Sequence, residues 1–141
     1  MRRYDSCATH DHFQRLRFRR ACVQPRLDRY REQAGGVVGH HGRGGSDPGS
    51  RISRYGVVAK GWAENIAYGQ RSARAIVMAL IIDDGVRGRG HRRNIFNRNY
   101  NTAGAAYGPH ARYGSVCSID FASRYAEGTL VRVGTDTTTS F

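Results

Sequence analysis

Apolar side chains recur with a helical period between residues 72 and 84. They occupy positions i, i+3, i+4, i+7 and i+8, which share one face of a helix: Ala73, Ile76, Val77, Leu80 and Ile81. Ser72 can cap the first backbone N–H groups, and Gly85 can end the helix after two aspartates. The pattern therefore predicts a helix that buries one face against a core.

After residue 102 the pattern changes to the period of strands. Residues 103–107 are small and predict a short strand, and residues 108–114 hold the glycines and the proline of a hairpin loop. The segment that follows alternates between an apolar face and a polar face: Cys117, Ile119 and Phe121 against Ser118 and Asp120. This alternation favours a buried core thiol at Cys117 over a nucleophile.

The patterns before residue 60 are weaker. Pro25 suits the first turn of a helix and Gly35 can end it, with one apolar face formed by Leu27, Tyr30 and Ala34. Residues 41–50 are rich in glycine and serine and predict a surface loop, and residues 51–55 predict a short helical stretch. We expect residues 61–69, which begin and end with glycine, to form a second loop.

The two ends of the chain differ from the middle. Residues 1–24 are rich in arginine with little apolar face, so we predict a basic, peripheral N-terminal segment. Residues 126–141 predict a tail with one edge strand at Thr129–Val133. The first residues are charged, so no signal peptide is visible. The longest apolar run, Ala75–Ile82, is shorter than the roughly 18 residues of a membrane span, so no transmembrane segment is expected.

A chain of 141 residues suits one domain with a core. Its formal net charge of +12 comes almost wholly from arginine, since Lys60 is the only lysine. Such a charge favours an anionic surface or nucleic acid as partner, whereas a GC-rich coding sequence would produce the same bias without function. The aromatic residues do not alternate with the arginines as a stacking platform requires. A basic nucleic-acid-binding protein therefore stays as a second alternative, with no specific nucleic acid expected.

The three cysteines, Cys7, Cys22 and Cys117, are an odd number without a CxxC pair. This arrangement excludes a zinc ribbon and disfavours a disulfide framework. A single bridge between Cys7 and Cys22 stays open.

Two short segments hold the candidate chemistry. In residues 61–69 (GWAENIAYG) the carboxylate of Glu64 lies between two aromatic residues, and in residues 90–97 (GHRRNIFN) His91 follows a glycine at a predicted helix start. A purely structural interpretation stays open, in which Glu64 pairs with His91 or an arginine, or caps the following turn. The aromatic residues Trp62 and Tyr68 are expected to serve packing.

These segments, in this order, resemble the CAP superfamily of cysteine-rich secretory, antigen 5 and pathogenesis-related proteins, in its bacterial type. The resemblance rests on residues 40–42 (HHG), 51–56 (RISRYG), 61–69, 90–97, 104–108 (GAAYG) and 118–121 (SIDF). It implies an SCP-like domain over residues 25–125. The implied fold is α+β, a three-layer α-β-α sandwich around a small, mostly antiparallel sheet.

The resemblance also implies a ligand cleft formed by His40, His41, Glu64 and His91. In many members of the family the two matching histidines, here His40 and His91, bind a divalent cation such as zinc, and carboxylates orient the site. The family has a second acidic residue about ten positions after the first histidine, where this chain has Gly49, Ser50 and Arg51. An arginine there would repel a cation and can occupy the cleft itself, and His41 can substitute as a ligand.

We expect the function to be binding and not turnover, outside the cell or at its surface by family inference. The candidate ligands are a lipid or sterol, an extracellular polymer, or a divalent cation. The alternative is a metal-dependent hydrolase that uses His40, Glu64 and His91 to polarise water. No serine or cysteine lies in an activating motif, which disfavours nucleophilic catalysis. The sequence does not indicate the oligomeric state.

Overall fold

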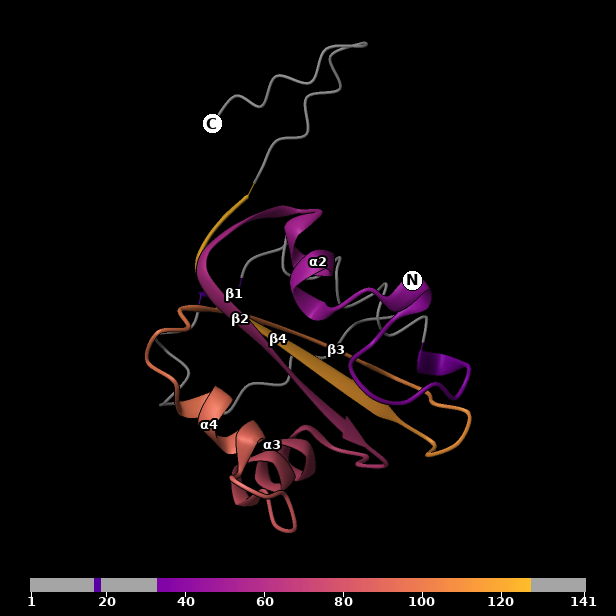
Figure 1. Ribbon diagram of the computed structural model, residues 1–141. Coiled ribbons are helices and arrows are strands. Elements are labelled where there is room, and N and C mark those ends of the chain that lie inside the picture. Colours follow the sequence, from indigo (N-terminus) through magenta and orange to yellow (C-terminus); the bar gives the residue numbers. More distant parts are fainter. Residues whose placement is uncertain (1–16, 19–32, 128–141) are drawn as a thin grey trace.

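The computed structural model describes residues 17–18 and 33–127 (Figure 1). The strands are β1 (Arg17–Phe18), β2 (Gly56–Tyr68), β3 (Thr102–Gly108) and β4 (Val116–Glu127). The helices are α2 (Pro48–Ser53), α3 (Ala73–Ile82) and α4 (Gly90–Phe96), with a 3-10 turn, η3, at Arg43–Gly45.

The strands form one sheet in the order β1-β3-β4-β2. The β3–β4 and β4–β2 pairs are antiparallel, and the two residues of β1 run parallel to β3. Helix α2 lies on one side of the sheet, and α3 and α4 lie on the other (Figure 1). This arrangement confirms the predicted α+β sandwich with a small, mostly antiparallel sheet.

The face of the sheet toward α3 and α4 is apolar. Cys117 and Ala67 pack there against Ile76 and Leu80 of α3, and Phe121 packs in a neighbouring cluster. Ser72 caps α3 as predicted, since its side chain accepts a hydrogen bond from the backbone of Ala75. Three of the five periodic positions of α3, Ile76, Val77 and Leu80, are thus buried, whereas Ala73 is exposed and Ile81 is half-buried. Burying each large apolar side chain contributes roughly 1.5–3 kcal/mol.

The opposite face of the sheet, toward α2, is also buried and combines an apolar cluster, Ile52 of α2 with Ala122 and Tyr125 of β4, with a polar group. Glu64, Ser118 and Asp120 project from β2 and β4 on this side, and each is at most 5% exposed. Arg51 enters the same layer from α2 and is 1% exposed. Because β4 is covered on both faces, its alternation does not separate core from solvent, and its α2 face has apolar as well as polar neighbours.

The prediction of a loop at residues 61–69 is wrong, because residues 61–68 belong to the 13-residue strand β2. Its small and polar residues carry little strand propensity, and pairing with β4 along nearly its whole length fixes its conformation. The register shifts between Val58 and Gly61, which marks a bulge near the start of β2.

Two helix boundaries also differ from the prediction. Helix α2 starts at Pro48 and not at Arg51, because Asp47 caps it and the proline occupies the first turn. Helix α3 ends at Ile82, before Gly85, and its C-cap residue Asp83 adopts the left-handed backbone conformation (φ 51°). The start of α4 at Gly90 and its end before Asn97 agree with the prediction.

The terminal segments, for which the sequence predicts a basic N-terminal part and a C-terminal tail, lie mostly outside the described residues. Two residues of the segment expected to be peripheral, Arg17 and Phe18, form β1 and pair with β3. Strand β4 continues to Glu127, so the boundary predicted between residues 125 and 126 falls inside a strand. Cys7, Cys22, the predicted edge strand Thr129–Val133 and most of the predicted helix after Pro25 are outside the described residues.

Among the described helices, none has the length and apolar composition that crossing a bilayer requires.

The position of Cys117 predicts slow thiol labelling in the native protein. Its side chain is buried in the cluster under α3, so a labelling reagent reaches it only when the sheet opens. In a variant with serine at the other two cysteine positions, labelling should be slow in buffer and fast in denaturant. Labelling in buffer at the denatured rate would contradict the assignment of Cys117 to the core.

Candidate functional site

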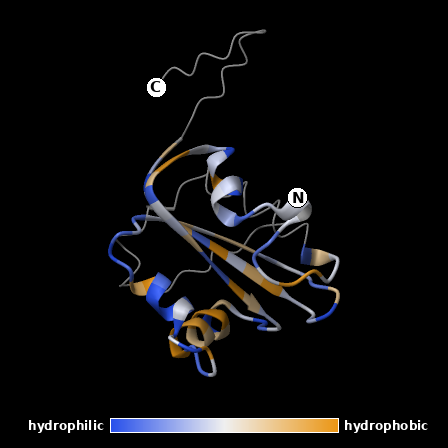
Figure 2. Ribbon diagram, in the orientation of Figure 1, coloured by the Kyte–Doolittle hydropathy of each residue, from blue (hydrophilic) through white to orange (hydrophobic). Residues whose placement is uncertain are grey.

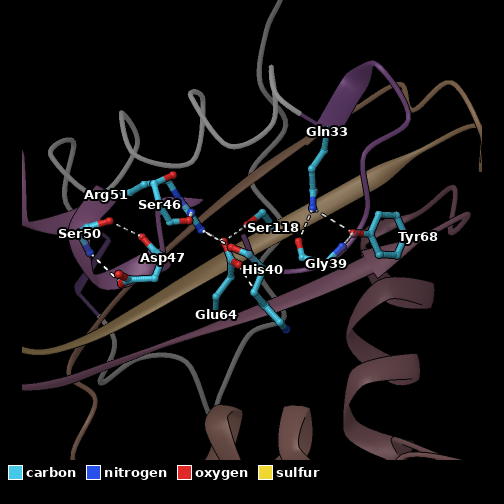
Figure 3. A network of polar contacts seen from close by, with 10 residues as sticks. All are labelled: Gln33, Gly39, His40, Ser46, Asp47, Ser50, Arg51, Glu64, Tyr68 and Ser118. Atoms are coloured by element: carbon cyan, nitrogen blue, oxygen red, sulfur yellow. Dashed lines mark hydrogen bonds and ion pairs between the residues drawn. The ribbon is translucent and has the colours of Figure 1, made fainter. Parts of the chain in front are cut away.

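The carboxylate of Glu64 is the centre of a buried polar network (Figure 3). Its Oε1 lies 2.8 Å from Nδ1 of His40. Its Oε2 accepts hydrogen bonds from Nη2 of Arg51 at 3.1 Å and from Oγ of Ser118 at 3.2 Å. Both oxygens of Glu64 are therefore already bonded within the protein.

Arg51 reaches this carboxylate from α2. Its guanidinium also donates to the backbone carbonyls of Ser46, at 2.8 Å, and of His40, at 3.1 Å. The side chains of Arg51 and Glu64 are each 1% exposed, so this ion pair is fully buried. Of the two structural partners that the sequence left open for Glu64, the structure contains the arginine and not His91.

Residues 49–51, where the resemblance implies a second acid, have other roles in α2. Any side chain at Gly49 would collide with the indole of Trp62. Ser50 bonds back to Asp47, the N-cap of the helix, and the hydrogen bond from the Ser50 backbone holds the pKa of Asp47 below its usual value. The remaining position, Arg51, turns inward and places a cation beside Glu64, as the sequence allowed.

His40 is held in place by the chain that precedes it. The Gln33 side chain donates to the carbonyl of Gly39 and to the hydroxyl of Tyr68, both at 2.9 Å. That hydroxyl in turn accepts from the backbone of Gly39 at 3.0 Å. The side chain of His40 is nevertheless 49% exposed, so its imidazole is fixed at one nitrogen and open to solvent.

His91 has a corresponding carboxylate partner, Asp83. The Nδ1 of His91 lies 2.7 Å from one oxygen of Asp83, and the backbones of His91 and Arg92 donate to the other oxygen. Burial raises the pKa of Asp83, but the hydrogen bonds from His91 and Arg92 outweigh it, and the pKa lies below its usual value. Asp83 thereby caps the first turn of α4, whose own N-cap residue makes no side-chain bond.

The two histidines form hydrogen bonds with neighbouring residues of β2, which is the outer strand of the sheet. His40 bonds to Glu64, and the carbonyl of His91 accepts from the side chain of Asn65 at 3.0 Å. Glu64 and Asn65 point to opposite faces, so the histidines approach the same edge from the two sides. Within residues 33–127, no hydrogen bond or ion pair joins His91 to His40 or Glu64.

The fit of these residues to a metal ion is partial. Each imidazole is bonded through Nδ1 to a carboxylate, as metal-binding histidines usually are. Neither Nε2 has a hydrogen-bond partner among the described residues. However, no group of three or more His, Cys, Asp or Glu in that part of the chain can hold a metal ion. His41, proposed as a substitute ligand, is exposed and belongs to no such group.

The sequence interpretation missed Asp83 and Ser118 as partners of the site. The helical pattern places Asp83 only at the end of a helix. The signal that indicates its role as the partner of His91 is a carboxylate eight residues before that histidine. Ser118 was placed correctly on the polar face of its strand, but not beside Glu64.

Breaking the buried pair should be costly. Glu64→Gln leaves the Arg51 charge without its partner and should lower the free energy of unfolding by about 3–5 kcal/mol. The double variant Arg51→Met/Glu64→Gln should lose less than the sum of the single variants. Asp47→Ala, which removes only the cap of α2, is the control and should cost about 0.5–2 kcal/mol. Urea denaturation of these three variants and of Arg51→Met measures the losses in free energy of unfolding. A loss in Glu64→Gln no larger than that in Asp47→Ala would refute a buried ion pair.

The lowered pKa of Asp83 predicts a contribution to acid sensitivity. Because the folded state holds this proton less tightly than the unfolded state, the contribution is complete above the ordinary value of 3.8 and disappears as pH falls through the lower folded value. Asp83→Asn tolerates the left-handed backbone and should flatten the fall in unfolding free energy on the acid side. Denaturant titrations at a series of pH values test this, with the exposed neighbour Asp84→Asn as the control. An unchanged pH profile in Asp83→Asn would contradict the prediction.

Comparisons with known proteins agree with this fold. An outer surface protein from Borrelia burgdorferi superposes with a TM-score of 0.65 at 15% identity, covering 79% of this chain and 79% of that one. An extracellular protein containing a SCP domain, from Bacillus anthracis strain Ames, superposes with a TM-score of 0.60 at 16% identity, covering 77% of this chain and 34% of that one. No curated protein sequence matches. At such identities the solved structures establish the fold alone, but the model of the cysteine-rich secretory protein family matches residues 26–121, more than half of the sequence. The chain therefore belongs to the CAP, or cysteine-rich secretory protein, family.

Proposed function

We propose that this chain is a non-catalytic binding domain of the cell exterior, and that it holds a divalent cation through Nε2 of His40 and Nε2 of His91. The observation that carries the proposal is the matched pairing of each imidazole with a buried carboxylate, at 2.8 Å for His40 and 2.7 Å for His91.

This pairing prepares both imidazoles for a cation. A carboxylate at Nδ1 keeps the proton on that nitrogen and leaves the lone pair on Nε2, which is the form that binds metal. It also fixes the ring, so less conformational entropy is lost on binding. A bound cation would present its remaining coordination positions to water or to oxygen atoms of an external ligand.

The network around Glu64 argues against the hydrolase alternative. Catalytic zinc sites usually have three protein ligands and a water molecule. Here both Glu64 oxygens are bonded, one of them to the Arg51 guanidinium at 3.1 Å. Using Glu64 as a third ligand would separate a buried arginine from its counter-charge, which is costly. A site with two imidazole ligands should bind a cation with modest affinity. The cation would then bridge the protein to an external ligand.

The family and its structural relatives support a place outside the cell. The matching family is named for secretory proteins, and the two similar structures are described as an outer surface protein and an extracellular protein. Among the candidate ligands, an extracellular polymer with oxygen donors suits an open cation best. A lipid or sterol would require an apolar site, and the described surroundings of His40 and Glu64 are polar.

Calorimetric titration of zinc tests the proposal. The wild type should bind one zinc ion weakly, and either His40→Ala or His91→Ala should abolish specific binding because one imidazole alone is a poor site. Affinity should weaken as pH falls, since protons compete for the imidazole nitrogens. His41→Ala is the matched control, an exposed histidine beside His40, and should bind zinc as the wild type does.

Equal zinc binding by the wild type and His91→Ala would contradict the proposed cation site. Loss of zinc binding in His41→Ala would instead show that His41 is a ligand, in place of the missing acid. Zinc-dependent hydrolysis of ester or peptide substrates that is lost in His91→Ala would revive the hydrolase alternative. Nucleic-acid binding with a steep dependence on salt would favour the second alternative.

A further inference from the structure

The outward face of α3 is unusual for a surface helix. An amphipathic helix normally turns polar residues toward solvent. In α3, which buries Ile76, Val77 and Leu80, five of the six exposed positions are apolar, and only Arg74 is polar: Ala73, Arg74, Ala75, Met78, Ala79 and Ile82. Met78 is 44% exposed and Ile82 is 51% exposed, so two large apolar side chains lie in water. Figure 2 shows α3 as hydrophobic along most of its length.

The apolar surface continues beyond the helix end. Val86, in the turn that follows α3, is 39% exposed. Met78 and Ile82 are one helical turn apart and lie on the same stripe. The patch therefore has a helical part and a loop part, and we call the surface formed by Met78, Ile82 and Val86 the apolar patch.

Arginines flank the apolar patch at both ends. Arg71 and Arg74 lie at the start of α3, and Arg87 and Arg89 follow Val86, all of them exposed. None of the four forms an ion pair with an acidic side chain of residues 33–127. The same stretch contains two acids, Asp83 and Asp84, against the four arginines, so its formal charge is +2.

Charge decides between the partners that could cover such a surface. A second copy of the chain would bring together two molecules of formal charge +12 at their arginine-rich faces. A soluble polyanion would use the arginines but leave the large apolar side chains in water. An anionic bilayer uses both, because apolar side chains enter the interface while arginines bind the phosphate groups.

We propose that the outward face of α3, with the apolar patch and the four flanking arginines, docks on an anionic lipid surface. The proposed surface consists of α3 and the turn after it, and does not include His40. It does not require a cation, so the proposal is independent of the zinc site.

Vesicle co-sedimentation of the full chain, with a chelator present, tests the proposal. The wild type should bind vesicles of equal parts phosphatidylcholine and phosphatidylglycerol, and should not bind phosphatidylcholine alone. Arg74→Ser/Arg87→Ser should weaken binding about 30-fold. Met78→Asp/Ile82→Asp should weaken it at least as much, because acidic groups would face the anionic interface.

The matched control changes the same residue types on the other side of the molecule. Arg54→Ser/Val57→Asp alters an exposed arginine after α2 and an exposed valine of β2, and should bind vesicles as the wild type does. Cooperative thermal unfolding of each variant, recorded alongside, ensures that only folded proteins are compared.

Three results would overturn the proposal. The first is no binding of the wild type to the anionic vesicles. The second is equal vesicle binding by the wild type and Met78→Asp/Ile82→Asp. The third is binding to soluble polyphosphate that competes fully with vesicles and is unaffected by Met78→Asp/Ile82→Asp, which would assign the surface to a polyanion.

Discussion

The buried ion pair between Arg51 and Glu64 joins α2, the loop that carries His40, and the sheet. Through it α2 is fixed to β2, and through the other carboxylate oxygen the loop that carries His40 is fixed to the same point. The guanidinium also donates to the carbonyls of Ser46 and His40, so the segment from His40 to α2 is held by hydrogen bonds to the charged group of Arg51. Such a pair adds little net stability after its desolvation cost, but it penalises any arrangement that separates the two charges. In this domain it therefore serves mainly to select one packing of α2 on the sheet.

The parts of the fold that depend on local sequence were predictable. The period of α3 and its serine cap, the alternation of β4, and the start of α4 just before His91 are all determined by residues close together in the chain. The place of Glu64 was not predictable in this way, because residues 61–69 look like a loop and become a strand only by pairing with β4. The partner of His91 depends on the left-handed backbone of Asp83, which directs that carboxylate across to α4. No periodic pattern encodes such a reversal.

The resemblance to a family selected His40, Glu64 and His91 as site residues but did not indicate the hydrogen-bond partners that the structure gives them. In the structure each histidine has its own carboxylate, Glu64 for His40 and Asp83 for His91, and the two pairs approach the outer strand from its two sides. The substitution at Arg51 accounts for part of this difference, since it provides Glu64 with an internal cation.

The bulge between Val58 and Gly61 in β2 has a consequence for the solubility of the protein. Outer strands expose backbone hydrogen-bonding groups along one side, and a long regular strand of this kind can recruit another chain and begin aggregation. Here the register is interrupted near the start of the strand, and the one lysine of the whole chain, Lys60, lies in the interruption. A kinked backbone with a strongly hydrated charge is a poor template for a further strand. The irregularity thereby guards a domain rich in exposed apolar side chains against amyloid-like association.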